Sequence, residues 1–332
     1  MGLISAKIDK KLIFAVMKQG IATVVKNAGS HYLLSELPVW APFPAVLKGK
    51  VRLSGSDSTN PVAVGDRVRF SCEGEPTDLE PARISEILDR SNHIIRRSTN
   101  LSRASHVIAA NVDMAYIIVS LYFPKIKLPF LDRILVTCEV YGVKATIVLN
   151  KVDLYGEEAE EEVAAFRKIY GGAGYPVIET STVTGEGIDA LRESCKGKVN
   201  LFSGESGVGK SSIIKALDPS LDPKVGKISL AHLQGRHTTS LYEMYPLGGH
   251  DPYGYVIDTP GLRGFGLVDL EKEEIALYFP EMLKAARGCR FTPCTHTHEP
   301  GCAVKEAVDA GIISLERYNS YLGMLEEDRK FR

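Results

Sequence analysis

The sequence predicts a multidomain α/β protein, in which a small β-barrel precedes an α/β domain and a short helical domain. Short β-like runs separated by Gly, Pro and Ser turns fill the first 90 residues. From residue 108, apolar strands alternate with helical segments, which is typical of a mostly parallel sheet. After residue 270 the chain reads as helical around a cysteine and histidine cluster. We therefore expect domains at residues 1–90, 91–270 and 271–332.

The N-terminal domain is expected to contain about five strands. The candidate strands are residues 20–25, 32–34, 46–53 and 83–88, and residues 64–70 read as a turn leading into a further strand. This number fits an OB-fold, a frequent binder of single-stranded nucleic acid and RNA, although a purely structural barrel fits the pattern equally well. The polar, basic stretch 90–103 favours a solvated linker, and a phosphate-contacting segment is the alternative.

The α/β domain is expected to place ligands at the carboxyl ends of its strands. Its predicted strands are residues 112–120, 145–149, 177–180, 199–203 and 255–257, and its predicted helices are residues 129–141, 157–170 and 211–217. Asn150, Gly204 and Asp258 each fall just past a strand end, where such a site would lie. Residues 314–330 read as a terminal amphipathic helix.

One glycine-rich segment matches the phosphate-binding pattern G-x-x-x-x-G-K-[ST] between a strand and a helix. It reads Gly204, Glu205, Ser206, Gly207, Val208, Gly209, Lys210, Ser211. Its backbone amides and the helix N-terminus suit nucleotide phosphates. Lys210 can reach the β- and γ-phosphates, and the Ser211 hydroxyl can bind Mg²⁺. A fortuitous glycine-rich turn is the alternative.

Two further segments complete a magnesium and γ-phosphate site. Asp258 begins a D-x-x-G motif, in which Asp258 would hold Mg²⁺ through water and the Gly261 amide would sense the γ-phosphate. Between the two motifs lies a Gly-Arg-His-Thr-Thr-Ser stretch, where Thr239, or Thr238 beside it, is the candidate switch ligand to Mg²⁺. A flexible polar loop is the alternative reading of that stretch.

Base recognition is indicated by the N-K-x-D segment Asn150, Lys151, Val152, Asp153. The Asp153 carboxylate can accept hydrogen bonds from guanine N1 and its exocyclic amine, a donor pair that adenine lacks. Ser181 follows in a segment that resembles the S-A-x loop contacting guanine O6. Since the base-reading motifs precede the phosphate loop, the reverse of the usual order, the pattern predicts a circularly permuted, Ras-like P-loop GTPase domain.

The residue after D-x-x-G is Leu262, where Ras-like enzymes place a glutamine that orients water. An apolar side chain cannot orient water, so hydrolysis should be slow alone or use another group. His237, beside the two threonines, is the candidate, and a loop histidine without a chemical role is an equal alternative. The predicted reaction is attack of water on the γ-phosphate with Mg²⁺ assistance.

The C-terminal domain carries a candidate metal centre. Its predicted ligands are Cys289, Cys294, His296 and Cys302, with His298 as a competing ligand. Three thiolates and one imidazole suit tetrahedral Zn²⁺, and four protein ligands leave no open position, so a structural ion is expected. The same cysteine usage argues against a secreted disulfide scaffold.

Composition sets limits on partners and location. The net charge of −1 excludes a global basic field, so contact with RNA must come from local patches or from shape. No apolar run reaches the roughly 18 residues of a membrane span, and the N-terminus lacks a signal-peptide core. We expect a cytoplasmic monomer that does not bind membranes.

Together, the motif order and the cysteine spacing resemble the circularly permuted, ribosome small-subunit-dependent GTPase family over nearly the whole chain. The resemblance implies guanine recognition by Asn150, Lys151 and Asp153, phosphate binding from Gly204 through Ser212, and zinc at the four predicted ligands. It also implies a late assembly factor that binds the small subunit and its rRNA with GTP. The subunit would stimulate hydrolysis to GDP and phosphate, and release would follow.

Leu262 agrees with this family, whereas Thr180-Ser181-Thr182 departs mildly from its S-A loop. Two other function classes also fit parts of the pattern. One is an RNA-binding checkpoint in which hydrolysis only times release. The other is a metabolic P-loop enzyme such as a small-molecule kinase, against which Asp153 argues because a kinase needs no guanine-reading carboxylate.

Overall fold

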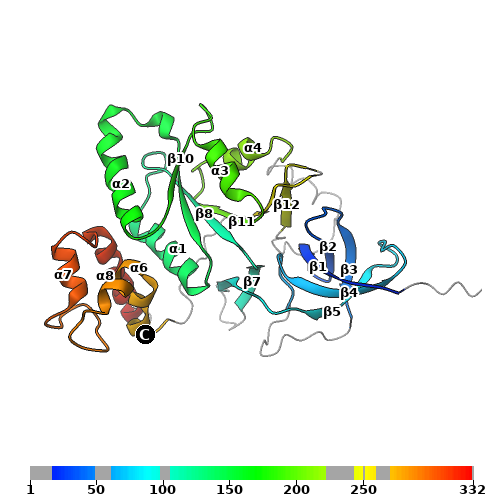
Figure 1. Cartoon of the computed structure of the whole chain (residues 1–332), viewed down its shortest axis with the longest axis horizontal. Coiled ribbons are helices and arrows are strands. Elements are labelled where there is room, and N and C mark those ends of the chain that lie inside the picture. The colour runs from blue at the N-terminus through cyan, green and yellow to red at the C-terminus, as the bar shows by residue number, and fades with distance from the viewer. Residues whose placement is uncertain are drawn as a thin grey trace, which may run out of the picture.

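The structure is a computed structural model. It describes residues 17–48, 61–97, 105–221, 243–249, 251–258 and 270–330. Figure 1 shows a barrel at one end, an α/β domain in the middle and a helical domain at the other end. This arrangement confirms the predicted fold class.

The barrel is built from five strands that close on themselves. They are β1 (Met17–Ala28), β2 (His31–Ser35), β3 (Phe43–Leu47), β4 (Arg67–Glu73) and β5 (Ala82–Ile87). The order is β1-β2-β3-β5-β4, and β4 pairs back to β1. Only β3 and β5 run parallel, which is the strand arrangement of an OB-fold. Alternate residues such as Leu34, Val68 and Phe70 fill the interior.

One barrel strand, β3, is shifted from its predicted position, whereas the turn before β4 agrees with the sequence prediction. β3 begins at Phe43, earlier than expected, and residues 49–60 lie outside the described part of the chain. β4 begins at Arg67, after a turn at Gly65, as the sequence predicts. Gly65 has φ +91°, and a Cβ there would lie 2.0 Å from the carbonyl oxygen of Ala110, so only glycine lets the turn approach Ala110.

The basic stretch after the barrel is not the predicted solvated linker. Instead, β6 (His93–Arg97) pairs antiparallel with β7 (Ser105–Ala110) in a two-stranded sheet. Ile94 and Ile108 are buried in the core of the α/β domain, which explains why the segment is ordered. The polar composition of the segment hid the strand signal of its buried isoleucines.

The α/β domain has five parallel strands and one antiparallel edge strand. Its sheet order is β10 (Val177–Thr180), β9 (Ala145–Asn150), β8 (Met114–Val119), β11 (Val199–Gly204), β13 (Gly254–Asp258) and β12 (Glu243–Leu247). The helices α1 (Leu128–Val140) and α2 (Glu160–Gly172) cover one face, and α3 (Ile188–Cys195) and α4 (Lys210–Leu217) cover the other. Two short 3-10 helices, η1 (Val152–Leu154) and η2 (Glu157–Ala159), lie between β9 and α2.

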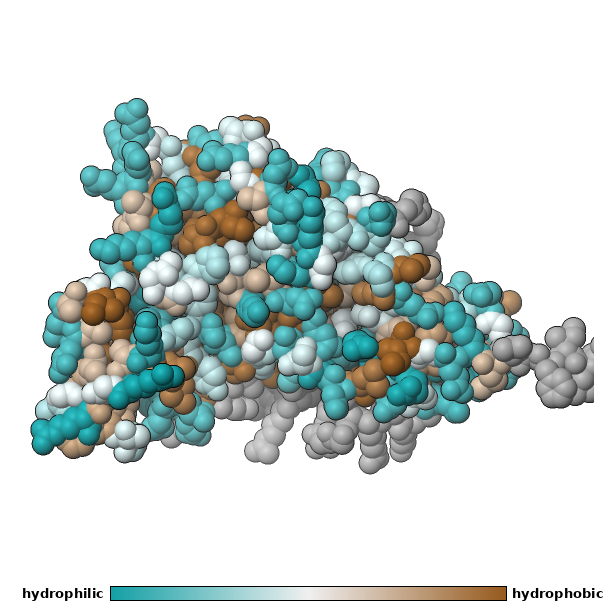
Figure 2. All heavy atoms as spheres, in the orientation of Figure 1, coloured by the Kyte–Doolittle hydropathy of each residue, from teal (hydrophilic) through white to brown (hydrophobic). Residues whose placement is uncertain are grey.

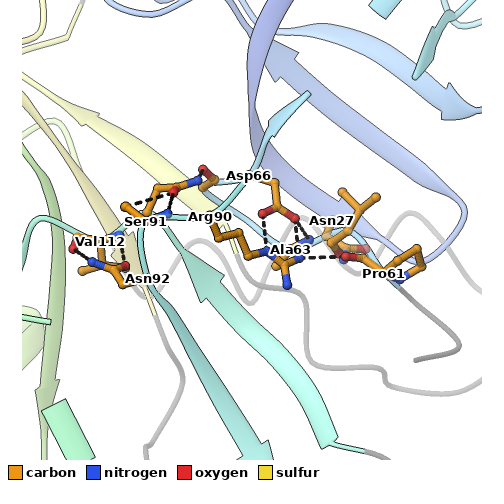
Figure 3. Close-up of polar contacts among 11 residues, drawn as sticks. Asn27, Pro61, Ala63, Asp66, Arg90, Ser91, Asn92 and Val112 are labelled. Carbon is orange, nitrogen blue, oxygen red and sulfur yellow. Dashed lines mark hydrogen bonds and ion pairs between the residues drawn. The ribbon is translucent and has the colours of Figure 1, made fainter. Parts of the chain in front are cut away.

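The barrel is joined to the α/β domain by strand pairing and by hydrogen bonds. β1 pairs with the edge strand β12 at Lys26 and Glu243, whose side chains also form a salt bridge of 3.0 Å. Figure 3 shows a buried ion pair at the end of the barrel, where the Arg90 guanidinium makes two 2.7 Å hydrogen bonds to the fully buried Asp66 carboxylate. Within the α/β domain, the Asn92 side chain bonds both polar groups of the Val112 backbone. Between the two domains, the Asn111 side chain donates to the Gly65 carbonyl at 3.0 Å.

The C-terminal domain consists of short helices packed on α1. They are α5 (Lys272–Ile275), η5 (Ala276–Tyr278), α6 (Pro280–Ala286), α7 (Ala303–Asp309) and the longer α8 (Leu315–Lys330). Its core includes Phe279, Met282 and Tyr321 together with Val136 of α1. The core therefore continues from this domain into the α/β domain.

The surface is mostly hydrophilic on the face seen in Figure 2, where apolar residues form several separate patches. Among the described residues, no helix is both long enough and apolar enough to cross a membrane.

Candidate nucleotide site and metal centre

The predicted nucleotide motifs meet at one edge of the sheet. β9 ends at Asn150, β10 at Thr180 and β11 at Gly204, and these strands are parallel, with β8 between β9 and β11. The carboxyl ends of parallel strands share an edge, which is where open α/β sheets bind ligands. Segments more than 50 residues apart in the chain are thus neighbours in space.

The N-K-x-D loop is bonded directly to the glycine-rich loop. Asn150 is buried, donates from Nδ2 to the Val208 carbonyl at 2.8 Å, and accepts from the Thr180 hydroxyl at 3.0 Å. Lys151 has φ +69°, a left-handed conformation that a lysine rarely adopts. From there its ammonium donates to the carbonyl of Gly207 at 2.6 Å. Both side chains therefore fix the relative position of the two loops.

Asp153 lies beside Ser181, which the sequence also predicts in the base site. Its carboxylate accepts a 2.6 Å hydrogen bond from the Ser181 hydroxyl, which itself accepts bonds from the amides of Val183 and Thr184 at 3.1 Å. Ser181 thus orders its own loop and orients the Asp153 carboxylate. The structure brings the N-K-x-D loop and the Thr180-Ser181-Thr182 segment together, as a guanine site would require.

The glycine-rich loop has the backbone geometry of a phosphate cradle. Gly207 and Gly209 have φ +89° and +100°, and a Cβ on Gly209 would lie 2.3 Å from Nδ2 of Asn150. α4 starts at Lys210, so the first amides of the helix face this loop. Since these amides lack partners within the helix, they can bind anionic oxygens. The Val208 side chain is buried and holds the loop against the core.

The remaining predicted nucleotide residues are only partly described. The backbone of Asp258 ends β13 and pairs in register with Phe202 of β11, two residues before Gly204. This register places the backbone of Asp258 beside the strand that leads into the glycine-rich loop. His237, Thr238, Thr239 and Gly261 lie outside the described residues.

The four predicted metal ligands form one cluster in the C-terminal domain. The ligand atoms of Cys289, Cys294, His296 and Cys302 all lie within 4.8 Å of one another. His296 Nδ1 is 3.4 Å from the Cys302 sulfur and 3.6 Å from the Cys289 sulfur. Tetrahedral zinc, with bonds of about 2.0–2.3 Å, requires ligand separations of roughly 3.5–3.8 Å. The cluster can therefore hold a metal ion.

The structure selects His296 rather than His298. His296 is buried and has φ +55°, whereas His298 is exposed and its Nδ1 is 2.9 Å from the Thr297 hydroxyl. The strained backbone at His296 turns its ring toward the three cysteines. Strain of this kind persists where surrounding contacts fix the backbone.

Glu299 and two tyrosines provide those contacts. The Glu299 carboxylate accepts hydrogen bonds from the amides of Thr295, Thr297 and His298. Burial raises the pKa of Glu299, but the hydrogen bonds outweigh burial and lower it to about 2. From α8, the Tyr318 and Tyr321 hydroxyls donate to the carbonyls of His296 and Thr295, each at 2.6 Å.

Comparison with known proteins identifies the family. The family model described as RsgA GTPase matches residues 87–268. A relative from Bacteroides fragilis, named Small ribosomal subunit biogenesis GTPase RsgA, is 48% identical over 311 residues, which cover 93% of this chain and 98% of the relative. The chain belongs to the RsgA GTPase family. The RsgA GTPase family is a family of GTP hydrolases.

Other RsgA relatives agree. A protein of the same name from Porphyromonas gingivalis is 44% identical over 93% of this chain and 97% of its own length. The crystal structure of YjeQ from Thermotoga maritima superposes with a TM-score of 0.76 at 31% identity, covering 93% and 98% of the two chains. YloQ, titled a circularly permuted GTPase, gives a TM-score of 0.69 at 23% identity, covering 95% and 96%, and therefore supports the fold alone.

Sequence reasoning missed several residues that organise this RsgA-family site. Glu299, Tyr318 and Tyr321 support the metal loop, and Tyr155 bonds the N-K-x-D loop. None belongs to a motif, because each acts through a contact that only the folded chain creates. Tyr155 follows Asp153 by two residues, but this spacing alone does not predict a role.

Proposed function

We propose that this chain is a cytoplasmic, monomeric GTPase of late small-ribosomal-subunit maturation. It binds the subunit and its rRNA with GTP bound, hydrolyses GTP to GDP and phosphate when the subunit stimulates it, and is then released. One structural observation carries the nucleotide part, namely the junction of the N-K-x-D loop, the Ser181 loop and the glycine-rich loop. The names of relatives that are 44–48% identical over 93% of this chain support the role in small-subunit maturation.

In this proposal, guanine is recognised by the N-K-x-D and Ser181 loops. Asp153 accepts hydrogen bonds from guanine N1 and the exocyclic amine, and the Ser181 loop presents a backbone amide to O6. The Ser181 hydroxyl, bonded to the Asp153 carboxylate at 2.6 Å, orients that carboxylate for the base. Adenine would leave the carboxylate without its two donors, so ATP is rejected.

The phosphates are bound by the segment from Gly204 through Ser212, and Lys210 neutralises charge on the β- and γ-phosphates. Mg²⁺, bound with GTP, would be held by Ser211 and Thr239, and through water by Asp258, and it supplies stabilisation of charge on the phosphate oxygens. Gly261 would report the γ-phosphate. We keep His237 as the candidate that places the attacking water, since Leu262 cannot orient water.

A single structural Zn²⁺ would be held by the cysteine and histidine cluster. Three thiolates and one imidazole are the donor set of closed zinc sites, and His296 Nδ1 lies 3.6 and 3.4 Å from the Cys289 and Cys302 sulfurs, near the separations that this geometry requires. Glu299 and the two tyrosines of α8 fix the loop that carries His296. The ion would therefore order the C-terminal domain rather than take part in hydrolysis.

The barrel is the proposed rRNA-binding domain. Its strand order is that of the OB-fold, a common RNA-binding scaffold. A hollow of about 640 Å³ opens where the β1–β2 turn meets the end of β3, lined by residues that include His31, Tyr32 and Leu47. Arg67, Arg69 and Arg83 are exposed on β4 and β5, where they can reach phosphates.

Co-sedimentation with purified ribosomal subunits tests this proposal. With a non-hydrolysable GTP analogue, the chain should sediment with small subunits, and replacing the analogue by GDP should release most of it. Large subunits and an ATP analogue serve as controls. Equal binding to both subunits, or binding that does not depend on the nucleotide, would contradict the proposed cycle.

A further inference from the structure

The segment between β8 and α1, residues 120–127, lies against both nucleotide loops. The Lys151 ammonium donates to the Phe123 carbonyl as well as to that of Gly207. A Cβ placed on Gly207 would lie 3.7 Å from Cδ of Pro124. Lys151 therefore binds two neighbouring backbone segments at once. Residues 120–127, which belong to no nucleotide motif, form a third side of the site.

Tyr155 joins this segment to the N-K-x-D loop. Its hydroxyl donates to the Asn150 carbonyl at 2.8 Å and accepts from the Leu121 amide at 2.8 Å. The hydroxyl of the buried Ser120 lies 3.2 Å away. The Tyr155 ring packs edge-on against Tyr122, with ring centroids 5.4 Å apart. One hydroxyl thus ties the end of β8 to the end of β9.

The hydrogen bond from Tyr155 to the Asn150 carbonyl acts at a position that controls the conformation of the N-K-x-D loop. This carbonyl belongs to the peptide that leads into Lys151, whose left-handed backbone is unfavourable for a residue with a side chain. The 3-10 helix that carries Asp153 starts directly after Lys151 and has no side-chain cap. The Tyr155 hydroxyl is protonated at neutral pH and can donate to Asn150, and burial raises its pKa further.

We infer that Tyr155 is a positioning residue for guanine recognition, which holds the N-K-x-D loop on the segment Ser120–Pro124 so that Asp153 faces the base. This inference rests on the proposed guanine site. Tyr155 acts through the Asn150 peptide, and its hydroxyl bonds Asn150, Leu121 and Ser120, none of which lies in the glycine-rich loop. Its loss should therefore weaken base recognition and leave the hydrolysis step unchanged.

The variant Tyr155→Phe tests the inference, because it removes the hydroxyl and keeps the ring. We expect its affinity for GDP to fall about tenfold, the factor expected for one lost hydrogen bond that orders a site. IDP lacks the exocyclic amine and can make only one of the two bonds to Asp153, so its affinity should fall less. The maximal rate of GTP hydrolysis at saturating GTP should remain that of the unmodified protein.

Tyr175→Phe is the matched control. The Tyr175 hydroxyl also donates one hydrogen bond, 3.0 Å to Glu139 Oε1, but Glu139 lies on α1 outside the nucleotide motifs. Both variants are measured well below their unfolding temperatures, which thermal unfolding establishes. Tyr175→Phe should leave the affinities for GDP and IDP unchanged even if it lowers the unfolding temperature.

The outcomes separate this inference from the proposed function. If the unmodified protein does not prefer GDP to ADP, the guanine site itself is wrong. If it does prefer GDP but Tyr155→Phe binds GDP equally well, the positioning role of Tyr155 is wrong and the site stands. Equal losses for GDP and IDP, or equal losses in both tyrosine variants, would also overturn the positioning role.

Discussion

Replacing Arg317 by alanine should lower the free energy of unfolding by about 3–5 kcal/mol, the usual effect of removing one partner from a buried ion pair. Arg317 lies in α8, and its side chain is 1% exposed. Its guanidinium bonds Asp132 of α1 at 2.8 Å and Glu281 of α6 at 2.8 and 3.1 Å. Alanine would leave both carboxylates without their cation, inside the interface between the two domains.

Aromatic rings add to the effect. The Arg317 guanidinium lies 4.6 Å from the centroid of the Phe279 ring and 5.4 Å from that of Tyr175. Burial raises the pKa of Asp132, and Arg317 opposes that rise. Alanine therefore removes the charge that favours the ionised Asp132, the cation–π contacts and the packing of the guanidinium.

Chemical denaturation followed by circular dichroism measures the loss. Arg69→Ala is the control, since Arg69 pairs with Glu86 at 2.8 Å while about half of each side chain is exposed, and exposed pairs add little stability. If Arg317→Ala and Arg69→Ala change the unfolding free energy equally, the Arg317 network does not hold the C-terminal domain on α1.

Loss of the metal should have the second large effect. Cys302→Ser and His296→Ala should each reduce bound zinc from one ion per chain to a small fraction of that. Structural zinc sites contribute about 10–16 kcal/mol of apparent binding energy in isolated zinc-finger peptides, and much of it is folding energy. The C-terminal domain should then become sensitive to limited proteolysis while the barrel remains resistant.

Two matched substitutions isolate the cluster. His298→Ala removes the exposed histidine two residues away, and Cys72→Ser alters a buried cysteine of the barrel, outside the cluster. Metal analysis by mass spectrometry should find one zinc ion per chain in both. Full zinc occupancy in Cys302→Ser, or loss of zinc in His298→Ala, would show that the ligand set is wrong.

The two effects are linked by α8. Tyr318 and Tyr321 bond the metal loop, and Arg317 on the same helix bonds α1. Loss of the metal would free the loop that these tyrosines hold, at one end of the interface with α1. The metal site can thus affect the α/β domain through packing on α1.

The sequence predicted those parts of the fold that depend on local pattern. Strands that end at Asn150 and Gly204 were visible because buried parallel strands are continuous apolar runs. The metal cluster was visible because its ligands are close in sequence. β12 was missed because Pro246 argues against a strand, although an edge strand tolerates proline.

Contacts between distant segments could not be predicted in this way. Nothing in a run of residues around Arg317 indicates that its partners are Asp132 and Glu281, because 185 residues separate Arg317 from Asp132. The same applies to Tyr155, whose three hydrogen-bond partners are set by how β8 and β9 lie side by side. Single polar residues acquire these roles only from tertiary packing.

The most direct measurement is the rate of GTP hydrolysis by the purified chain with and without small ribosomal subunits. We expect slow turnover alone and strong stimulation by small subunits, with no stimulation by large subunits and no hydrolysis of ATP. Equal rates with and without small subunits, or equal turnover of ATP and GTP, would contradict this expectation.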